Sequence, residues 1–233
     1  MATYVVTGAN RGIGLELVAQ LVAQGHHVLA TARQPERAEA LSALTSAHPG
    51  QLEILALDVS DPASITAFGQ AVGDRPVDVL INNAGVLLRG GGPGELDYEK
   101  IELTFRINTL GPLRVTEALL PALRAAAQPV IANITSQMGS IADNTSGGAY
   151  SYRISKAALN MAIRSLSLDL GRQGMVALVL HPGWVQTDMG GPNAKITVEE
   201  SCSGLADVVE KAGGPNSGGG FRFVNYEGKD LPL

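Results

Sequence analysis

Apolar, β-branched runs alternate with helical patterns along the whole 233-residue chain, and this alternation limits the fold more than any other feature. The apolar runs are hydrophobic at successive positions, as in Ile54-Leu55-Ala56-Leu57, which is typical of strands covered on both faces. Strand–helix repetition of this kind predicts an α/β fold with an open, doubly wound parallel sheet. The expected strands are Thr3–Thr7, His27–Ala32, Leu52–Leu57, Val77–Asn82, Pro129–Thr135, Met175–His181 and Phe221–Val224, and the expected helices are Gly12–Gln24, Pro35–Ala47, Pro62–Val72, Tyr98–Leu120, Tyr152–Leu170 and Val198–Lys211.

Proline, glycine and aspartate mark the ends of these elements. Pro35 and Pro62 stand where first-turn prolines belong, and Asp61 is expected to cap the helix that follows it. Gly25 and Gly174 follow helical patterns as stop signals. No linker divides the chain, so we expect a single domain over residues 1–233. The two richest Gly/Pro stretches, expected to be surface loops, are Arg89–Gly94 and Gly213–Gly220.

Composition excludes several classes of protein. With 45% hydrophobic residues the chain can bury a sizeable core, which excludes disorder. Lysine and arginine number 17 against 22 acidic residues, and the net charge of −5 argues against binding to nucleic acid or an anionic membrane. The single cysteine, Cys202, cannot form a disulfide within the chain. We find no signal-type segment and no run of about 18 apolar residues, so we expect a cytoplasmic protein.

A glycine turn, Thr7-Gly8-Ala9-Asn10-Arg11-Gly12-Ile13-Gly14, joins the first expected strand to the first expected helix. In such a turn the backbone can approach a pyrophosphate closely, and the N-terminus of the helix stabilises its charge. The three glycines do not match the G-x-G-x-x-G spacing, and a purely steric role is the alternative. The position of the turn in the first strand–helix unit favours nucleotide binding, because this architecture binds nucleotides there.

The end of the second expected strand indicates which nicotinamide cofactor fits. Chains that prefer NAD normally carry an acid about 20 residues after the glycine turn, which binds the ribose 2′-hydroxyl. Here the strand ends in Thr31-Ala32-Arg33, and the nearby Glu36 follows Pro35 in the manner of a first-turn helix acid. Arg33 and Arg11 can instead bind a 2′-phosphate through charge-assisted hydrogen bonds, which favours NADP. The alternative is that both are solvated surface arginines.

Two further strand ends carry polar side chains. Asp58, in Leu57-Asp58-Val59, can accept a hydrogen bond from an adenine amino group, or can cap the next turn together with Asp61. The run Asn82-Asn83-Ala84-Gly85 ends the fourth expected strand, where amide side chains can bind both a cofactor and the neighbouring backbone. Both strand ends are therefore expected to contribute to a cofactor site.

Tyr152 and Lys156 lie four residues apart at the start of a helical pattern, a spacing that places both side chains on one helix face. A phenol with an ordinary pKa of about 10 is a poor acid–base catalyst near neutrality, and a nearby ammonium lowers that pKa. The pair therefore indicates a proton-transferring tyrosine. A chance pair on a helix surface is the alternative.

Ser136 follows the fifth expected strand, and its hydroxyl is expected to face the crevice where such folds bind ligands. There it can donate a hydrogen bond to a substrate carbonyl oxygen, with Thr135 and Ser140 as alternatives if the register differs. Asn108 lies inside a helical pattern, where asparagine has a poor propensity. Its amide can hold a water that links Lys156 to solvent, or can bond a neighbouring carbonyl.

Together these motifs resemble the short-chain dehydrogenase/reductase family. The resemblance runs over nearly the whole chain, in order and at family spacing, and implies a seven-stranded Rossmann fold and NADPH-dependent reduction of a ketone or aldehyde. The run from Asp143 to Tyr152, the PGWVQTDMGG run and the tail from Gly228 to Pro232 are most similar to a branch of small carbonyl reductases with sniffer-type and C-factor-like members. The matching motifs are TGxxxGxG at Thr7–Gly14, NNAG at Asn82–Gly85, Asn108, Ser136, Tyr152-xxx-Lys156 and PGxxxT at Pro182–Thr187.

The resemblance also implies a role for each matching residue. Tyr152 gives its proton to the developing alkoxide, and Ser136 stabilises the same oxygen. Lys156 lowers the pKa of Tyr152 and binds the nicotinamide ribose, while Asn108 completes a proton relay. The implied cofactor contacts are Gly8, Asn10, Arg11, Gly12, Ile13, Gly14, Arg33, Asp58, Val59, Asn82, Ala84, Gly85, Tyr152, Lys156, Pro182, Gly183, Val185 and Thr187.

Residues in the loops that follow the fifth and sixth expected strands are expected to line a substrate site: Met138, Trp184 and Met189. Packing under a lid is the alternative for these three. None of the four histidines lies at metal-ligand spacing, so no metal site is expected, and His181 is expected near the cofactor crevice without a catalytic role. We expect a small-molecule carbonyl substrate and no nucleic-acid or membrane partner, and the resemblance allows a homodimer or homotetramer. The alternative functions are an NAD(P)-binding regulatory or signalling protein without turnover, and an NAD-linked alcohol dehydrogenase.

Overall fold

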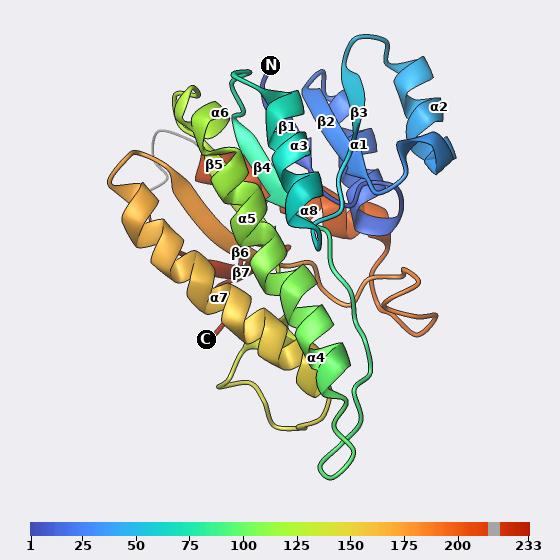
Figure 1. Cartoon of the computed structure of the whole chain (residues 1–233), viewed down its shortest axis with the longest axis vertical. Helices are drawn as coiled ribbons and strands as arrows, with labels where there is room; N and C mark the ends of the chain where they lie inside the picture. Colours follow the sequence, from blue (N-terminus) through green and yellow to red (C-terminus); the bar gives the residue numbers. More distant parts are fainter. Residues whose placement is uncertain (214–219) are drawn as a thin grey trace.

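The computed structural model describes residues 1–213 and 220–233, and within them seven strands form one parallel sheet (Figure 1). The strand order is β3-β2-β1-β4-β5-β6-β7, so the predicted doubly wound α/β fold is confirmed. Part of the expected loop Gly213–Gly220, residues 214–219, lies outside the described residues. The strands are β1 (Thr3–Val6), β2 (His27–Ala32), β3 (Leu52–Ala56), β4 (Val79–Asn82), β5 (Val130–Ile134), β6 (Val176–His181) and β7 (Phe223–Asn225).

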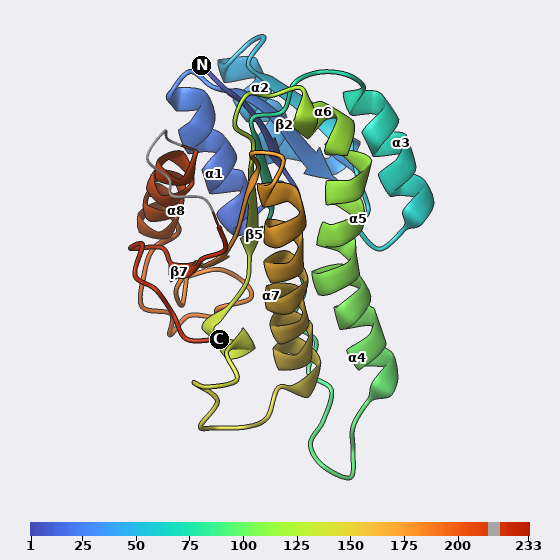
Figure 2. The same ribbon diagram turned by 90° about the vertical axis from the view of Figure 1, so that its left-hand side faces the viewer.

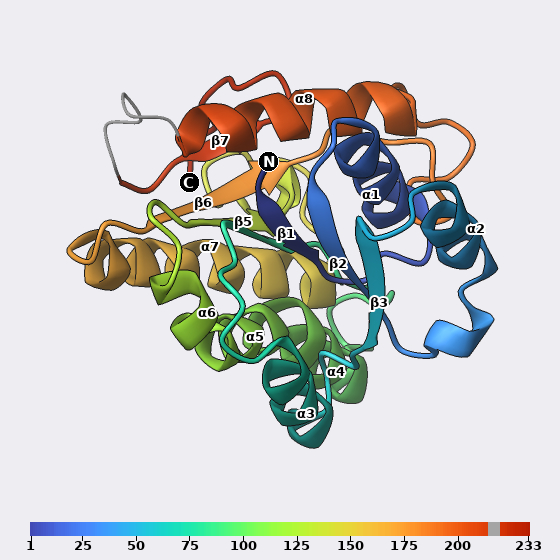
Figure 3. The same cartoon turned by 90° about the horizontal axis from the view of Figure 1, so that it is seen from above.

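Helices cover both faces of this sheet. They are α1 (Gly12–Ala23), η1 (Pro35–Arg37), α2 (Glu39–Ala47), α3 (Pro62–Val72), α4 (Tyr98–Phe105), η2 (Arg106–Leu110), α5 (Gly111–Ala118), α6 (Leu120–Arg124), η3 (Gln137–Gly139), α7 (Tyr150–Gly171) and α8 (Val198–Ala212). Seen from above, α1, α2 and α8 lie on one face, and α3, α4, α5, α6 and α7 lie on the other (Figure 3). Cover on both faces explains why the central strands are apolar at successive positions.

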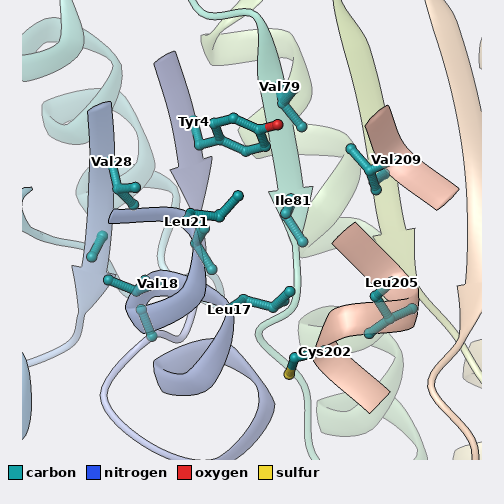
Figure 4. Close-up of a cluster of buried hydrophobic side chains, with 14 of the residues drawn as sticks. Tyr4, Leu17, Val18, Leu21, Val28, Val79, Ile81, Cys202, Leu205 and Val209 are labelled. Carbon is teal, nitrogen blue, oxygen red and sulfur yellow. The ribbon is translucent and has the colours of Figure 1, made fainter. Parts of the chain in front are cut away.

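The core is divided by the sheet into two clusters, because successive side chains of a strand point to opposite faces. Val6 of β1 packs on the face covered by α1 and α8, and Val5 packs on the other face. Figure 4 shows the first cluster, where Leu17 of α1 lies near Leu205 and Cys202 of α8. Cys202 is completely buried, and burial raises the pKa of its thiol, so this cysteine is an inert packing residue.

The long helix expected over Tyr98–Leu120 is interrupted. Its central turn, Arg106–Leu110, is a π-helical turn between α4 and α5, and α6 begins separately at Leu120. Pro112 accounts for the interruption, because proline has no N–H to donate to the carbonyl four residues earlier and its ring collides with that carbonyl. Figure 2 shows α4 and α5 running alongside α7, so the widened turn lies against the start of α7.

The expected element ends are largely confirmed. Pro62 opens α3, and the Asp61 carboxylate accepts a hydrogen bond from the Ala63 N–H at 3.0 Å, as a capping aspartate does. The helix expected from Pro35 divides into η1 and α2 at Ala38. Over residues 1–213 and 220–233, no helix combines the length and apolar character needed to cross a bilayer.

Candidate active site

The carboxyl ends of β1, β4, β5 and β6 meet along one edge of the sheet, and the strand order reverses between β1 and β4. In doubly wound folds ligands bind at such a reversal. A cavity of about 450 Å³ lies at this edge. Its lining includes Ser136, Tyr152, His181, Trp184 and Met189.

The glycine turn is packed tightly against the end of β4. Gly8 has a φ of +64°, and a Cβ built there would lie 2.9 Å from the Ala84 Cα. A Cβ at Gly14 would lie 2.4 Å from the Gly8 carbonyl oxygen. Glycine is therefore required at both positions by close backbone approach, whether or not a ligand binds.

Asn83 holds this turn in place by bonding the neighbouring backbone, one of the two uses expected for the amides of the Asn82–Gly85 run. Its Nδ2 donates to the Thr7 carbonyl at 2.9 Å and to the Gly8 carbonyl at 3.1 Å. The backbone N–H groups of Asn83 and Ala84 both donate to the Thr7 hydroxyl at 3.0 Å. The only signal in the sequence was the pair of adjacent asparagines.

The Asn82 side chain is turned into the protein interior. Its Nδ2 donates to the Asn133 Oδ1 at 3.0 Å and to the Thr116 hydroxyl at 3.3 Å, and the residue is 2% exposed. Its Oδ1 is buried and has no hydrogen-bond partner within the described part of the chain. The side-chain contacts of Asn82 thus join β4 to β5 and α5, while the neighbouring residues Ala84 and Gly85 lie beside the glycine turn and Lys156.

Tyr152 and Lys156 lie on one face of α7, as their spacing predicts, and both are buried. The Lys156 ammonium lies 5.7 Å from the centre of the Tyr152 ring and donates to the Ile134 carbonyl at 2.8 Å. Gly85 closes the other side, where a built Cβ would lie 3.7 Å from the Lys156 Nζ. The ammonium is therefore enclosed between β5, the end of β4 and the tyrosine.

Burial changes the proton affinity of both groups. It raises the pKa of Tyr152 to about 12, although the Ser136 hydroxyl has the opposite, lowering effect. It lowers the pKa of Lys156 to about 8. Desolvation therefore outweighs the lowering by Ser136, and the expected lowering of the phenol pKa by the Lys156 ammonium is not seen in the protein chain alone. Tyr152 keeps its proton at neutral pH.

The Lys156 shift makes stability depend on pH. Between pH 8 and 10.5 the unfolded chain binds more protons at this lysine than the folded chain does. The free energy of unfolding therefore increases as pH rises across that range. We expect the stability of the wild type to gain on the order of 3 kcal/mol relative to Lys156→Met over these pH values. Urea unfolding of both proteins at several pH values measures the difference, and a constant difference would contradict a buried ammonium.

Ser136 is the residue at the end of β5 with a hydroxyl suited to a ligand. The Ser136 backbone is extended. Its Oγ accepts a hydrogen bond from the Met138 N–H at 3.2 Å, so the hydroxyl proton can still be donated. The Thr135 hydroxyl instead donates to the Asn160 Oδ1 at 2.7 Å. Ser140 is 2% exposed and accepts from the Asp143 N–H. Of the three alternatives, Ser136 therefore has the best geometry for donation into the cavity.

Asn108 occupies the π-helical turn and is completely buried. Its Nδ2 donates to the Val86 carbonyl at 2.8 Å and to the Ser155 hydroxyl at 3.1 Å, and its Oδ1 accepts from the Val86 N–H at 2.9 Å. These contacts match the alternative in which the amide bonds a neighbouring carbonyl. They fix the chain after β4 against α7, directly beside Lys156.

The charged groups expected at the cofactor end of the site have other partners. Arg11 pairs with Asp188, which belongs to the loop after β6. Burial acts to raise the pKa of Asp58, but two hydrogen bonds from Ser60 and the nearby Arg33 lower it overall. The contacts of Asp58 therefore match the turn-capping alternative, with Arg33 close to its carboxylate.

The loop after β6 lies over the glycine turn. A Cβ built at Gly12 would lie 3.5 Å from the Thr187 Cγ2, so the two segments touch. Trp184 and Met189 are about half exposed and line the cavity together with Met138. His181 is also in the lining, and burial lowers its pKa to about 4, so its imidazole is neutral at neutral pH.

The chain is similar to known proteins over its full length. The family model for short chain dehydrogenases matches residues 2–196. The protein "C-signal" of Myxococcus xanthus is 53% identical over 166 residues, which are 71% of this chain and 98% of that protein.

Solved structures extend the similarity to the whole fold. NADPH-bound carbonyl reductase from chicken fatty liver is 39% identical with a TM-score of 0.90, and covers 100% of this chain and 99% of its own. Carbonyl reductase Sniffer of D. melanogaster is 34% identical with a TM-score of 0.92, and covers 100% of both chains. With its parallel sheet, glycine turn and Ser136–Tyr152–Lys156 cluster, the chain belongs to the short-chain dehydrogenase/reductase family.

Proposed function

We propose that this protein is an NADPH-dependent oxidoreductase that reduces a ketone or aldehyde to an alcohol. The observation that carries the proposal is the placement of the Ser136 and Tyr152 side chains in one cavity, with the Lys156 ammonium buried against the Tyr152 ring. This cavity lies at the carboxyl ends of β5 and β6, and Ile13 of the glycine turn is in its lining. A protein that only binds a nucleotide has no need for such a cluster.

The residues around the glycine turn fit a dinucleotide cofactor. The turn leads into the N-terminus of α1, where no side chain caps the helix, so the N–H groups of its first turn can bind a pyrophosphate. Residues Gly8–Gly14 would hold the pyrophosphate, and Lys156 with the Pro182–Thr187 segment would hold the nicotinamide end. When bound, the cofactor supplies a hydride to the carbonyl carbon.

The chain itself then supplies a proton and a hydrogen bond. Burial keeps Tyr152 protonated, so its O–H can transfer the proton to the carbonyl oxygen as the alcohol forms. The free proton of the Ser136 hydroxyl can stabilise negative charge on that oxygen. Lys156 places a positive charge beside the tyrosinate that remains, and the apolar side chains of Met138, Trp184 and Met189 favour a substrate with apolar surface.

The proposal is tested by following NADPH absorbance with a panel of aldehydes, diketones and ring ketones. Saturable oxidation of NADPH with an alcohol as product is expected. Tight NADPH binding without turnover of any compound would contradict the proposal.

Arg33 is expected to select NADP over NAD, because it lies at the end of β2 near Asp58 and there is no acid at that strand end. We expect Arg33→Asp to weaken NADPH binding by about 10–100-fold, as one charge-assisted hydrogen bond to the 2′-phosphate is lost. NADH binding should change little or improve. Fluorescence titration of both cofactors measures the ratio, and unchanged NADPH affinity would show that Arg33 is only a surface arginine. Arg37→Asp is the matched control, since the Arg37 guanidinium donates to the side chain of Gln34, the residue before η1.

A second function is favoured by one comparison. The name of the relative "C-signal", which is 53% identical, favours a signalling role for this chain as well. The corresponding alternative is a regulatory protein of the same fold that binds NAD(P) without significant turnover. NADPH binding with no turnover in the panel would favour this function.

A further inference from the structure

Asn160 is a buried amide on α7 that the proposed reaction does not use. It lies one turn after Lys156 and is 2% exposed. Its Oδ1 accepts from the Thr135 hydroxyl at 2.7 Å, and its Nδ2 donates to the Gly139 carbonyl at 3.4 Å. Thr135 and Gly139 stand on either side of Ser136, so one side chain holds both ends of the segment that carries the Ser136 hydroxyl.

The segment from Thr135 to Gly139 lies directly on α7. A Cβ built at Gly139 would lie 2.8 Å from the Lys156 carbonyl carbon and 2.9 Å from the Lys156 Cβ. The Gly139 N–H donates to the Ser136 carbonyl at 2.8 Å, which closes the turn of η3. The glycine permits this contact. Three hydrogen bonds tie the segment to α7: the two of Asn160 and one from the Arg153 guanidinium to the Met138 carbonyl at 3.3 Å. Only those of Asn160 reach both sides of Ser136 from one side chain.

The buried amide of Asn160 is suited to orienting the segment that carries Ser136. An apolar side chain of similar size would fill the space, but it would leave the Thr135 hydroxyl and the Gly139 carbonyl without their partner. Asn160 offers one acceptor and one donor, which match these two groups. Asn160 lies on the same helix as Tyr152 and Lys156, two turns after Tyr152. By holding the Thr135–Gly139 segment, Asn160 therefore fixes the position of that segment relative to Tyr152.

We propose that Asn160 is a positioning residue that sets the Ser136 hydroxyl against the Tyr152 phenol through Thr135 and Gly139. The inference rests on the proposed function, in which both hydroxyls act on one oxygen. Small displacements of a hydrogen-bond donor at such a site have large effects on rate.

The test is a cycle of four proteins: wild type, Asn160→Ala, Ser136→Ala and the double variant. We expect Ser136→Ala to lower kcat about 100-fold and Asn160→Ala about 10-fold. In the Ser136→Ala background, Asn160→Ala should cost no further activity, because its effect passes through Ser136. An equal loss of kcat in both backgrounds would overturn the proposal, since a purely structural residue acts in both.

Three further variants keep the test independent of folding defects. Thr135→Val removes the hydrogen bond to Asn160 from the other side and should lower kcat like Asn160→Ala, whereas Thr135→Ser keeps a hydroxyl and should restore most of it. Ser167→Ala is the matched control on α7, where a buried hydroxyl donates to the Arg164 carbonyl at 2.7 Å, away from Ser136. It should leave kcat unchanged, and equal loss in all three variants would contradict a positioning role.

Crystal structures separate this inference from the proposed function. If the wild type shows no turnover, the proposed function fails, but the position of Ser136 can still be compared between the wild type and Thr135→Val. A Ser136 Oγ displaced from the Tyr152 hydroxyl would support the role of Asn160. An unchanged separation would overturn it.

Discussion

Tyr152→Phe is expected to lower kcat for carbonyl reduction by about 10²–10⁴-fold, because the variant lacks the proton that the product alcohol needs. The ring remains, so its packing against Lys156 and the fold of α7 should be preserved. NADPH affinity should change by less than about 10-fold, since at most one neutral hydrogen bond is lost. NADPH absorbance gives the rate, and fluorescence titration gives the affinity.

Tyr150→Phe is the matched control for this experiment. Tyr150 is the first residue of the same helix, and it does not line the cavity that contains Ser136 and Tyr152. Its rate should equal that of the wild type. Retention of full activity in Tyr152→Phe would remove Tyr152 as the proton donor, whereas loss of both rate and NADPH binding would point to a damaged site.

Gly14→Ala is expected to weaken NADPH binding strongly. The new methyl group would lie 2.4 Å from the Gly8 carbonyl oxygen and 2.6 Å from the Asn83 Nδ2, so the glycine turn must move. Loss of one backbone hydrogen bond to a charged phosphate weakens binding by about 10–100-fold, and overpacking lowers stability by about 1–3 kcal/mol. Titration with NADPH and thermal unfolding measure the two effects.

Gly171→Ala provides the control for adding a methyl group to a glycine. A Cβ at Gly171, the last residue of α7, has no atom within 4 Å among its described neighbours. The variant should bind NADPH as the wild type does and be equally or slightly more stable. If Gly14→Ala behaved in the same way, the close packing of the turn would not be needed for cofactor binding.

Predictions from the sequence succeeded where residues interact with near neighbours in the chain. The Asp61–Pro62 start of α3 and the shared face of Tyr152 and Lys156 depend only on local geometry, and both are confirmed. The expected helix Tyr98–Leu120 was wrong in one respect, because the effect of Pro112 on the carbonyl of Asn108 widens one turn. That turn then brings Asn108 against Val86 and Ser155.

Buried amides could not be interpreted in the same way. Asn82 bonds to Asn133, which is 51 residues away, and Asn160 bonds to Thr135, which is 25 residues away. No local pattern distinguishes an asparagine that joins two strands from one that faces a cofactor. The pairing of β4 with β5 and the packing of α7 on β5 decide which partners are within reach.

The parallel α/β sheet, the glycine turn and the order of the polar residues at the strand ends are predictable from the amino-acid sequence alone. These follow from hydrophobic periodicity and from spacing along one strand or helix, which are local properties. The environment of those residues, in contrast, arises only when the chain is folded. Tyr152 and Lys156 have pKa values of about 12 and about 8 because atoms from several distant segments exclude water around them. Desolvation depends on every surrounding group at once, and no spacing along the chain records it.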